Sequence, residues 1–271
     1  MNYYLTIDLG ATKTLVALFD KNGRIIKSTR FPSEHDFNSF SNKLITHLTP
    51  LQKYPIANIT FAICGLVEHG SPTLLRNLDW NNPPLYNCIK ILFNCPVYFL
   101  NDADAATYYE SKYYSGHVMY LTFSTGLGGG LAIDKTLITE SSAFEPGETL
   151  VEWKDKTVRW TTIASARALG EAYNSRVSNI HSLRTLHDLS LRLTTGLTPL
   201  ILKYQPDVII FGGAVGYILN RFRLLLAYDL RKSIAKSKGI PTKKVRLPHL
   251  ARAKKPLRST TFGAFLYGRE H

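Results

Sequence analysis

Two segments of the chain place a short polar turn between two apolar runs. In "YLTIDLGATKTLVALFD" (residues 4–20) Asp8 interrupts the first run, and Gly-Ala-Thr-Lys precedes the second. In "MYLTFSTGLGGGLAI" (residues 119–133) Ser, Thr and Gly occupy the corresponding position. Each segment predicts a β-hairpin, although hairpins between buried strands normally favour Asn-Gly or Asp-Gly at the turn. The residue types at both turns therefore suggest a role besides reversing the chain.

These turn residues suit a phosphate group. A turn rich in Gly, Ser and Thr exposes backbone N–H groups and hydroxyls, and its small side chains leave room for phosphate oxygens. Asp8 would repel a phosphate directly, but it could hold Mg²⁺ through water and so neutralise phosphate charge. Two such turns predict a binding site for a chain of phosphates. A purely structural turn is the alternative for each hairpin taken alone.

The residues before position 116 predict an α/β arrangement, with helices over a mixed sheet. Asp36 or Ser39 is the expected cap of the first helix, and the Pro- and Asn-rich stretch after residue 66 is expected to be irregular. Strands are predicted at 3–8, 14–20, 24–30, 58–66 and 96–102, and helices at 36–54, 85–93 and 103–111.

The remaining residues repeat this beginning. The polar passage 110–117 is the predicted boundary between domains at 1–115 and 116–271, and both halves open with a hairpin, which suggests two related lobes. The terminal helix is free in this scheme to pack back on the first lobe. Strands are predicted at 118–124, 130–134 and 207–213, with one short strand after 134, and helices at 162–176, 184–204, 217–237 and 259–268.

Composition predicts a soluble, cytoplasmic globular protein. Of 271 residues, 45% are hydrophobic and 20% charged, and the longest apolar run, at 208–219, is broken by glycines. No charged and apolar leader precedes the first strand. The three cysteines, Cys64, Cys88 and Cys95, lack metal-ligand spacing, so we expect them to pack in the core and expect no zinc.

The net charge of +13 is concentrated near the carboxyl terminus. Residues 221–271 contain 14 Lys and Arg against two acidic residues, whereas the preceding 220 residues are nearly neutral. Such a segment attracts a polyanion, or it forms a solvated cationic face that only aids solubility. Both interpretations stay open from the sequence.

Two further motifs follow predicted strands. In "NDADAA" (101–106) the carboxylate of Asp102 suits a general base that takes a proton from a hydroxyl attacking phosphorus. The alternative is that Asp102 or Asp104 caps the following helix. In "IIFGGAVG" (209–216) the paired glycines suit a flat shelf for a nucleotide, or equally a tight helix–strand contact.

Together these motifs resemble those of the ROK family (repressors, open reading frames, kinases) within the sugar-kinase, actin and heat-shock-ATPase superfamily. "IDLGATKT" resembles the first phosphate motif, "NDADAATYYE" the Asn-Asp-Ala-Asn-Ala-Ala motif, and "FSTGLGGGLAI" the Gly-Thr-Gly-x-Gly-Gly-Gly segment. "FGGAVG" resembles the adenosine motif and "FGAFLYG" the closing helix, in the same order. The resemblance implies two ribonuclease-H-like α/β lobes with a central cleft, the actin-like ATPase fold.

The resemblance also implies roles for individual residues. It makes Asp102 the catalytic base, Asn101 a sugar ligand and Asp8 the Mg²⁺ carboxylate. It implies phosphate and nucleotide contacts from Gly10, Thr12, Lys13, Thr125, Gly126, Gly128, Gly212 and Gly213.

The chain departs from the family pattern around the sugar site. The family's Gly-Glu-x-Gly-His appears only within "FEPGETLVEW" (144–153), where Glu145 aligns and Glu148 stands in place of histidine. Thr161 stands where a Glu is usual, and the Cys-rich zinc segment is absent. Glu145 and Glu148 are therefore the candidate sugar-binding residues, and the changes put hexose specificity in doubt.

The sequence thus predicts an enzyme, an ATP- and Mg²⁺-dependent kinase for a hexose or N-acetylhexosamine hydroxyl. One rival uses inorganic polyphosphate as donor, and another is a sugar- or nucleotide-binding regulator without turnover. The expected partners are the sugar and the nucleotide or polyphosphate. We expect no membrane or nucleic-acid partner, because no aromatic and basic stacking motif occurs, and relatives commonly form homodimers. No helix-turn-helix precedes Tyr4, so we do not expect a repressor.

Overall fold

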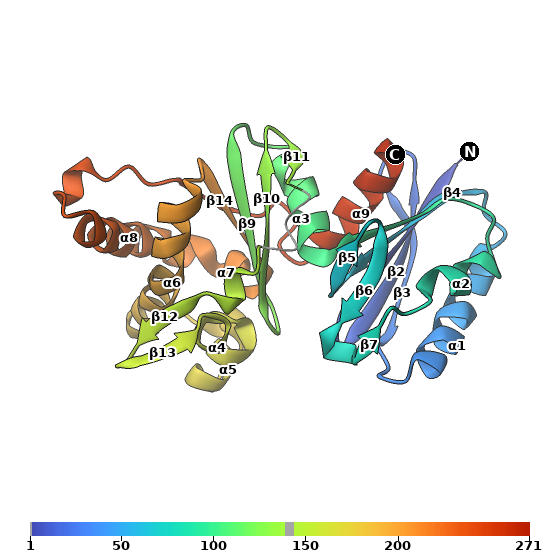
Figure 1. Ribbon diagram of the computed structural model, residues 1–271, viewed down its shortest axis with the longest axis horizontal. Coiled ribbons are helices and arrows are strands. Elements are labelled where there is room, and N and C mark those ends of the chain that lie inside the picture. Colours follow the sequence, from blue (N-terminus) through green and yellow to red (C-terminus); the bar gives the residue numbers. More distant parts are fainter. Residues whose placement is uncertain (1, 139–143) are drawn as a thin grey trace. The chain divides into compact units, whose positions relative to one another are not determined.

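The computed structural model describes residues 2–138 and 144–271, and it consists of two compact units (Figure 1). Unit 1 comprises Met1–Tyr109 and Thr260–His271, and unit 2 comprises Glu110–Ser259. The chain therefore leaves unit 1 after Tyr109, close to the passage 110–117, and returns to it for the terminal helix. Among the described residues, no helix combines the length and the apolar character needed to cross a bilayer.

Unit 1 is built on a five-stranded sheet in the order β3-β2-β1-β4-β8. Strands β1 to β3 form an antiparallel meander, whereas β4 and β8 run parallel to β1. The carboxyl ends of β1, β4 and β8 therefore share one edge of the sheet. The strands are β1 (Tyr3–Leu9), β2 (Lys13–Asp20), β3 (Ile25–Pro32), β4 (Ile56–Ile63) and β8 (Val97–Asn101).

Helices cover both faces of this sheet (Figure 1). Alternate residues of β1, such as Leu5 and Ile7, belong to the core formed with α1 (Phe37–Leu48) and α2 (Leu85–Lys90). The opposite face carries small residues such as Ala62, against which α3 (Asp102–Ser111) and α9 (Ser259–Glu270) pack through Ala105 and Ala264. Side chains alternate between the two faces of a strand, so one face of the sheet carries large apolar residues and the other carries small residues that let helices pack closely.

Several predicted boundaries in unit 1 need correction. The predicted helix 36–54 is α-helical only over Phe37–Leu48, because Pro50 lies in the 3₁₀ turn that follows, although Asp36 caps it as expected by accepting from Ser39 N at 2.8 Å. Strand β4 ends at Ile63. The stretch predicted to be irregular forms a small antiparallel sheet of β5 (Leu66–Glu68), β6 (Ser71–Leu75) and β7 (Trp80–Asn81).

Unit 2 repeats the topology of the first sheet, with the order β11-β10-β9-β14-β15. The first three strands are antiparallel, and β14 and β15 run parallel to β9. The duplication suggested by the two hairpins is therefore present in the sheets. The strands are β9 (His117–Phe123), β10 (Leu127–Ile133), β11 (Thr136–Leu137), β14 (Val208–Gly212) and β15 (His249–Arg252).

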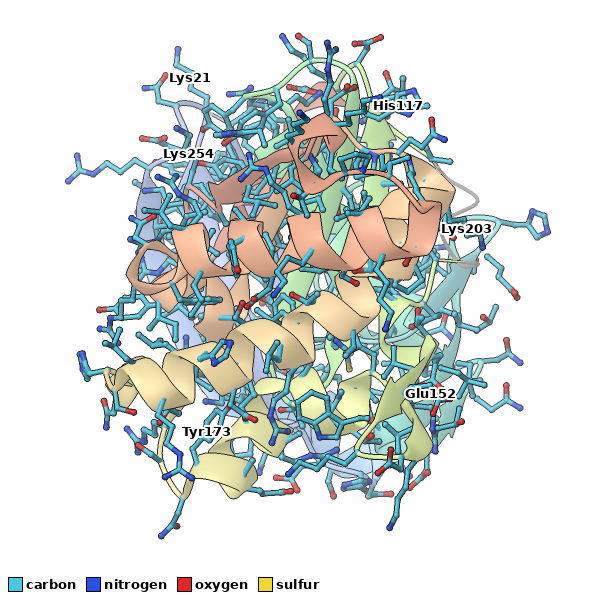
Figure 2. All side chains as sticks on the ribbon, turned by 90° about the vertical axis from the view of Figure 1, so that its left-hand side faces the viewer. Lys21, His117, Glu152, Tyr173, Lys203 and Lys254 are labelled. Atoms are coloured by element: carbon cyan, nitrogen blue, oxygen red, sulfur yellow. The ribbon has the colours of Figure 1, made fainter. Side chains whose placement is uncertain are left out.

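The helices of unit 2 cover one face of its sheet around the buried residues Phe123, Trp160 and Phe211. Helices α6 (Leu183–Tyr204) and α8 (Arg223–Lys238) lie side by side in Figure 2 and are joined by a hydrogen bond from Ser190 Oγ to the buried Asp229, 2.5 Å long. The smaller elements are β12 (Leu150–Trp153), β13 (Lys156–Arg159), α4 (Thr161–Ala164), α5 (Ala166–Tyr173) and α7 (Gly213–Ile218).

Unit 2 also corrects several predictions. The helix predicted at 162–176 is divided at Ser165, whose hydroxyl accepts from Ala168 N and so begins a new helix. The helix predicted at 217–237 consists of the end of α7, a 3₁₀ turn and α8. Strand β10 begins at Leu127 rather than at residue 130, and the sequence analysis missed β12, β13 and β15.

Candidate functional site

The turn between β1 and β2 is fixed by its backbone and by one serine. Gly10 N donates to Lys13 O at 3.1 Å, and Ser33 donates its hydroxyl to Gly10 O at 2.7 Å. Ser33 N also donates to Thr12 O, so Ser33 holds both sides of the turn. The side chains of Thr12 and Lys13 are exposed. Sequence reasoning missed Ser33, because it lies outside the motif and meets the turn only through the pairing of β2 with β3.

Asp8 lies one residue before the end of β1, on the closely packed face of the sheet. Thr261 of α9 donates its hydroxyl to Asp8 Oδ2 at 3.0 Å. Burial raises the pKa of Asp8 to about 6, and the Thr261 hydrogen bond and the charge of Arg30 act in the opposite direction. A nearby cation would stabilise the charged form of this carboxylate. Thr261 was missed as a site residue, because only the fold brings α9 to β1.

Asn101 ends β8 and Asp102 begins α3 at the same sheet edge. Asn101 Oδ1 accepts from Ala103 N at 2.8 Å and from Asp104 N at 3.3 Å, so Asn101 is the cap of α3. The alternative that Asp102 caps this helix is borne out in part, because Asp102 Oδ1 also accepts from Ala103 N at 2.8 Å. Asn101 Nδ2 donates to Gly65 O at 2.9 Å. The amide of Asn101 thus orients the start of α3, which carries Asp102.

Cys64 lies beside these carboxylates. Its backbone N–H donates to Leu9 O at 2.9 Å, directly after β4. Burial, together with the negative charges of Asp102 and Asp8, raises the pKa of the Cys64 thiol to about 12. One edge of unit 1 therefore brings together Asp8, Cys64 and Asp102, as expected for the ends of neighbouring parallel strands.

The turn between β9 and β10 is short and open. Ser124, Thr125 and Gly126 are exposed, Ser124 N donates to Gly126 O at 2.9 Å, and a methyl group added at Gly126 would meet no atom within 4 Å. Gly128, predicted as a turn residue, lies instead inside β10, opposite Thr122. Room for a ligand therefore exists around Thr125 and Gly126, whereas the side-chain space at the neighbouring Gly129 is filled by Phe144.

The glycines after β14 have a clear packing role. A methyl group at Gly212 would lie 2.0 Å from the Tyr120 hydroxyl oxygen. Gly213 has a φ of +62°, and a methyl group there would lie 2.2 Å from Phe123 O. Gly213 N donates to Pro256 O at 2.8 Å. The tight-packing interpretation is therefore confirmed, and the nucleotide shelf stays a prediction.

The segment with the candidate sugar residues packs against the strand that follows the second turn. A methyl group at Gly147 would lie 2.3 Å from Leu127 O and 3.2 Å from the Thr161 Cβ. Glu145 is exposed, and Glu148 accepts from Arg159 Nη1 at 3.2 Å. The structure therefore brings Glu148, Thr161 and the start of β10 together. Arg159 was missed by sequence reasoning, because the β12–β13 hairpin that carries it was not predicted.

Some cations of the basic carboxyl-terminal region lie at the two ends of β15 in unit 2. Arg252, Lys254, Lys255 and Arg258 lie on β15 and on the segment after it, which contacts β14 and Gly213 through Ala253 N and Pro256 O. Other cations lie at the amino end of β15, where Arg223 and Arg231, together with His249, line a groove of about 330 Å³. The strand direction puts this groove at the sheet edge opposite Gly212, so it is not part of the candidate site.

The residues around the two turns differ in which group they could hold, Mg²⁺ or the phosphates of ATP. Among the described residues no group of three or more His, Cys, Asp or Glu side chains could enclose a metal, which is compatible with Mg²⁺ held by one carboxylate, waters and phosphates. Asp8 fits such a role because the Thr261 hydrogen bond and the charge of Arg30 do not offset the cost of burying its negative charge. The open space at Gly126 fits a phosphate. The residues present are therefore compatible with both groups.

Comparison with known proteins identifies the family. The model of the ROK family matches residues 4–244, and the chain belongs to this family. The resemblance inferred from the motifs is thereby confirmed.

Relatives differ in what they do. The chain is 28% identical over 141 residues to the N-acetylmannosamine kinase of Yersinia pestis (strain Pestoides F), a match covering 49% of this chain and 48% of that protein. It is 22% identical over 247 residues to the Xylose repressor of Bacillus spizizenii, covering 79% of this chain and 64% of the repressor. The match thus spans about half the length of the kinase, and the family includes both enzymes and regulators.

Solved structures share the fold. The ROK family glucokinase of Streptomyces griseus, in complex with glucose and AMPPNP, superposes with a TM-score of 0.78 and 18% identity over 99% of this chain and all of the other. The inorganic polyphosphate/ATP-glucomannokinase of Arthrobacter sp. strain KM gives a TM-score of 0.72 and 20% identity over the whole of both chains. The predicted fold class, that of the actin-like ATPases, is confirmed.

Proposed function

We propose that this chain is a sugar kinase that transfers the γ-phosphoryl group of ATP to a hydroxyl of a hexose or N-acetylhexosamine. The observation that carries the proposal is the pair of carboxylates, Asp8 and Asp102, at the carboxyl ends of parallel strands in unit 1. Each has a hydrogen-bonded support, Thr261 for Asp8 and the cap Asn101 for the helix of Asp102. A scaffold without turnover has no chemical need for both carboxylates.

Asp102 acts as the general base in this mechanism. Its carboxylate accepts the proton of the acceptor hydroxyl while the hydroxyl oxygen forms a bond to the γ-phosphorus, and the bond from phosphorus to the bridging oxygen of ADP breaks. Asn101 fixes the start of α3 through Ala103 N and Gly65 O, which limits the orientations open to Asp102. Catalysis then comes mainly from orientation and from charge stabilisation.

The remaining residues hold the donor. Asp8 would hold Mg²⁺, which neutralises phosphate charge when bound. Thr12, Lys13, Thr125 and Gly126 would bind phosphates through exposed hydroxyl, ammonium and backbone groups. Gly212 and Gly213 would face the adenosine, on a backbone that their packing keeps rigid.

Glu145 and Glu148 would bind the acceptor. Their segment packs closely against β10 at Gly147. This packing supports a sugar-binding position close to the proposed phosphate-binding residues of unit 2. Arg159 holds Glu148 in an ion pair. A carboxylate that accepts hydrogen bonds therefore stands in place of the imidazole usual in the family. Hydroxyl groups of the sugar can donate to such a carboxylate.

A second donor is supported by the cations near Gly213. Arg252, Lys254, Lys255 and Arg258 form a dense positive segment beside the proposed nucleotide shelf, as inorganic polyphosphate would require. A polyphosphate reaction would slow steeply as salt concentration rises, because exposed cations are screened. The ATP reaction would be less sensitive, since fewer charges are involved.

The test is a transfer assay with Mg²⁺-ATP and, in parallel, polyphosphate, against hexoses and N-acetylhexosamines including N-acetylmannosamine and glucose. Sugar phosphate would be detected directly by mass spectrometry. The Asp102→Asn protein is the blank, and it should lose transfer by about 100- to 10,000-fold, the usual contribution of a general base. Absence of any sugar phosphate with either donor, while the protein still binds sugar or ATP, would contradict a kinase and favour a regulator.

A further inference from the structure

Glu110 is a buried acid that the proposed mechanism does not use. It ends the motif "NDADAATYYE" and is the first residue of unit 2. Its side chain is fully buried, and both carboxylate oxygens are engaged by one segment. Lys254 N donates to Oε2 at 2.8 Å, and Lys255 N and the Ser259 hydroxyl donate to Oε1 at 3.1 and 2.6 Å.

The segment held by Glu110 also supports the proposed nucleotide shelf. Pro256, which lies between Lys255 and Ser259, accepts a hydrogen bond from Gly213 N at 2.8 Å. Ala253 N, on the other side, donates to Phe211 O at 2.9 Å. Glu110 therefore fixes the chain at Lys255, directly before the carbonyl that meets Gly213, and at Ser259, three residues after it.

Gly213 has little freedom of its own. Its φ is +62°, a methyl group added to it would lie 2.2 Å from Phe123 O, and its N–H is held by the Pro256 carbonyl. The two neighbouring N–H groups of Lys254 and Lys255 form a concave donor pair, which a carboxylate fills well. Hydrogen bonds to a buried charge are stronger than those between neutral groups, and both donors lose their partner if the carboxylate is removed.

We propose that Glu110 is a positioning residue for the nucleotide. Its carboxylate orders residues 253–259, and through the Pro256 carbonyl it sets the backbone of Gly213 on which the adenosine would rest. This inference depends on the proposed function, because it assigns Glu110 to the nucleotide part of that site. It predicts that loss of the carboxylate weakens the use of ATP while leaving the acceptor and the chemical step almost unchanged.

The experiment compares Glu110→Gln with the wild type in steady-state kinetics and in ATP binding by calorimetry. Glutamine keeps the size of the side chain, but its amide nitrogen cannot accept a hydrogen bond, so at least one backbone N–H loses its acceptor. We expect the KM and the Kd for ATP to rise at least tenfold, with the KM for the acceptor and kcat within about threefold of wild type. Glu171→Gln, a substitution of an exposed glutamate in the same unit, is the matched control and should change neither.

Ser259→Ala keeps the inference testable if Glu110→Gln folds poorly. It removes one of the three donors to Glu110, and we expect it to raise the KM for ATP about two- to fivefold. An unchanged ATP affinity in a folded Glu110→Gln or Ser259→Ala protein would overturn the inference and leave the kinase proposal intact. Failure of the wild type to bind ATP at all would overturn both.

Discussion

The two units share one sheet topology but carry different chemistry at the carboxyl edges of their sheets. In unit 1 the penultimate residue of the first hairpin strand is Asp8, paired with Leu15, and in unit 2 the corresponding residue is Thr122, paired with Gly128. Unit 1 adds a second carboxylate, Asp102, after β8. Unit 2 offers hydroxyls, backbone and cations. The same scaffold thus supplies carboxylates in one copy and hydroxyls, backbone groups and cations in the other.

The difference has a physical basis in the parallel neighbours of each hairpin. Ala62 beside Asp8 leaves room for the Thr261 hydroxyl to reach the carboxylate, whereas Gly212 beside Thr122 is crowded by the Tyr120 hydroxyl. Unit 1 therefore keeps a buried acid with a supporting donor. Unit 2 keeps a tightly packed backbone that presents N–H groups and small residues.

The largest expected effect comes from removing the acid that distinguishes unit 1. Asp8→Asn should lower kcat/KM by roughly 100-fold or more, because the neutral amide holds Mg²⁺ poorly. The measurement is kcat/KM over a Mg²⁺ titration. Asp79→Asn, at an exposed aspartate of the same unit, is the control and should have no effect. An equal Mg²⁺ dependence in wild type and Asp8→Asn would contradict the role of Asp8.

Gly263→Ala should disturb the support of both carboxylates in unit 1. Alanine normally favours a helix by up to about 1 kcal/mol, but here its methyl group would lie 1.7 Å from Ala105 O. The clash should outweigh the gain in helix propensity and lower the free energy of unfolding by about 1–3 kcal/mol. Denaturant unfolding measures this. The control is Gly126→Ala, where the added methyl group meets no atom within 4 Å and stability should not change.

Arg159→Ala tests the acceptor part of unit 2. The ion pair with Glu148 is more than half exposed on both sides, so its loss should alter the free energy of unfolding by less than about 1 kcal/mol. The KM for the sugar should nevertheless rise several-fold, because Glu148 loses its orientation. Lys156→Ala, at an exposed residue of the same hairpin, is the control. An unchanged sugar KM would remove Glu148 from the acceptor site.

The last prediction concerns Cys64, which reports on the carboxylates around it. A pKa of about 12 lowers the thiolate fraction at pH 8 by roughly 1000-fold relative to a thiol of pKa 9.0, so iodoacetamide should modify Cys64 far more slowly in the native than in the unfolded protein. Asp102→Asn should speed the native reaction, since it removes one nearby negative charge. Peptide mass mapping follows the modification, and equal rates in native and unfolded protein would contradict these surroundings.

Much of this arrangement could be predicted from the sequence. Asp8, Asp102 and the two hairpins were found because turn residues and strand ends are local signals, and the family follows from the same motifs. The supports of these residues could not be found. Thr261 and Ser33 reach the site through strand pairing and helix packing, which link residues up to 253 positions apart. Asn101 was missed as a cap of α3, a role that it shares with Asp102, because several neighbouring residues could fill that role equally well.

The most direct test measures single-turnover transfer as ATP concentration is varied, for wild type, Asp102→Asn and Gly126→Ala. If Asp102 supplies the base and the turn at Gly126 binds phosphate, Asp102→Asn should lower the plateau rate at least 100-fold with an unchanged half-saturating ATP concentration. Gly126→Ala should raise that concentration about tenfold or more, with a plateau near wild type. The opposite pattern, in which Asp102→Asn shifts only the ATP dependence or Gly126→Ala lowers only the plateau, would contradict this division of roles.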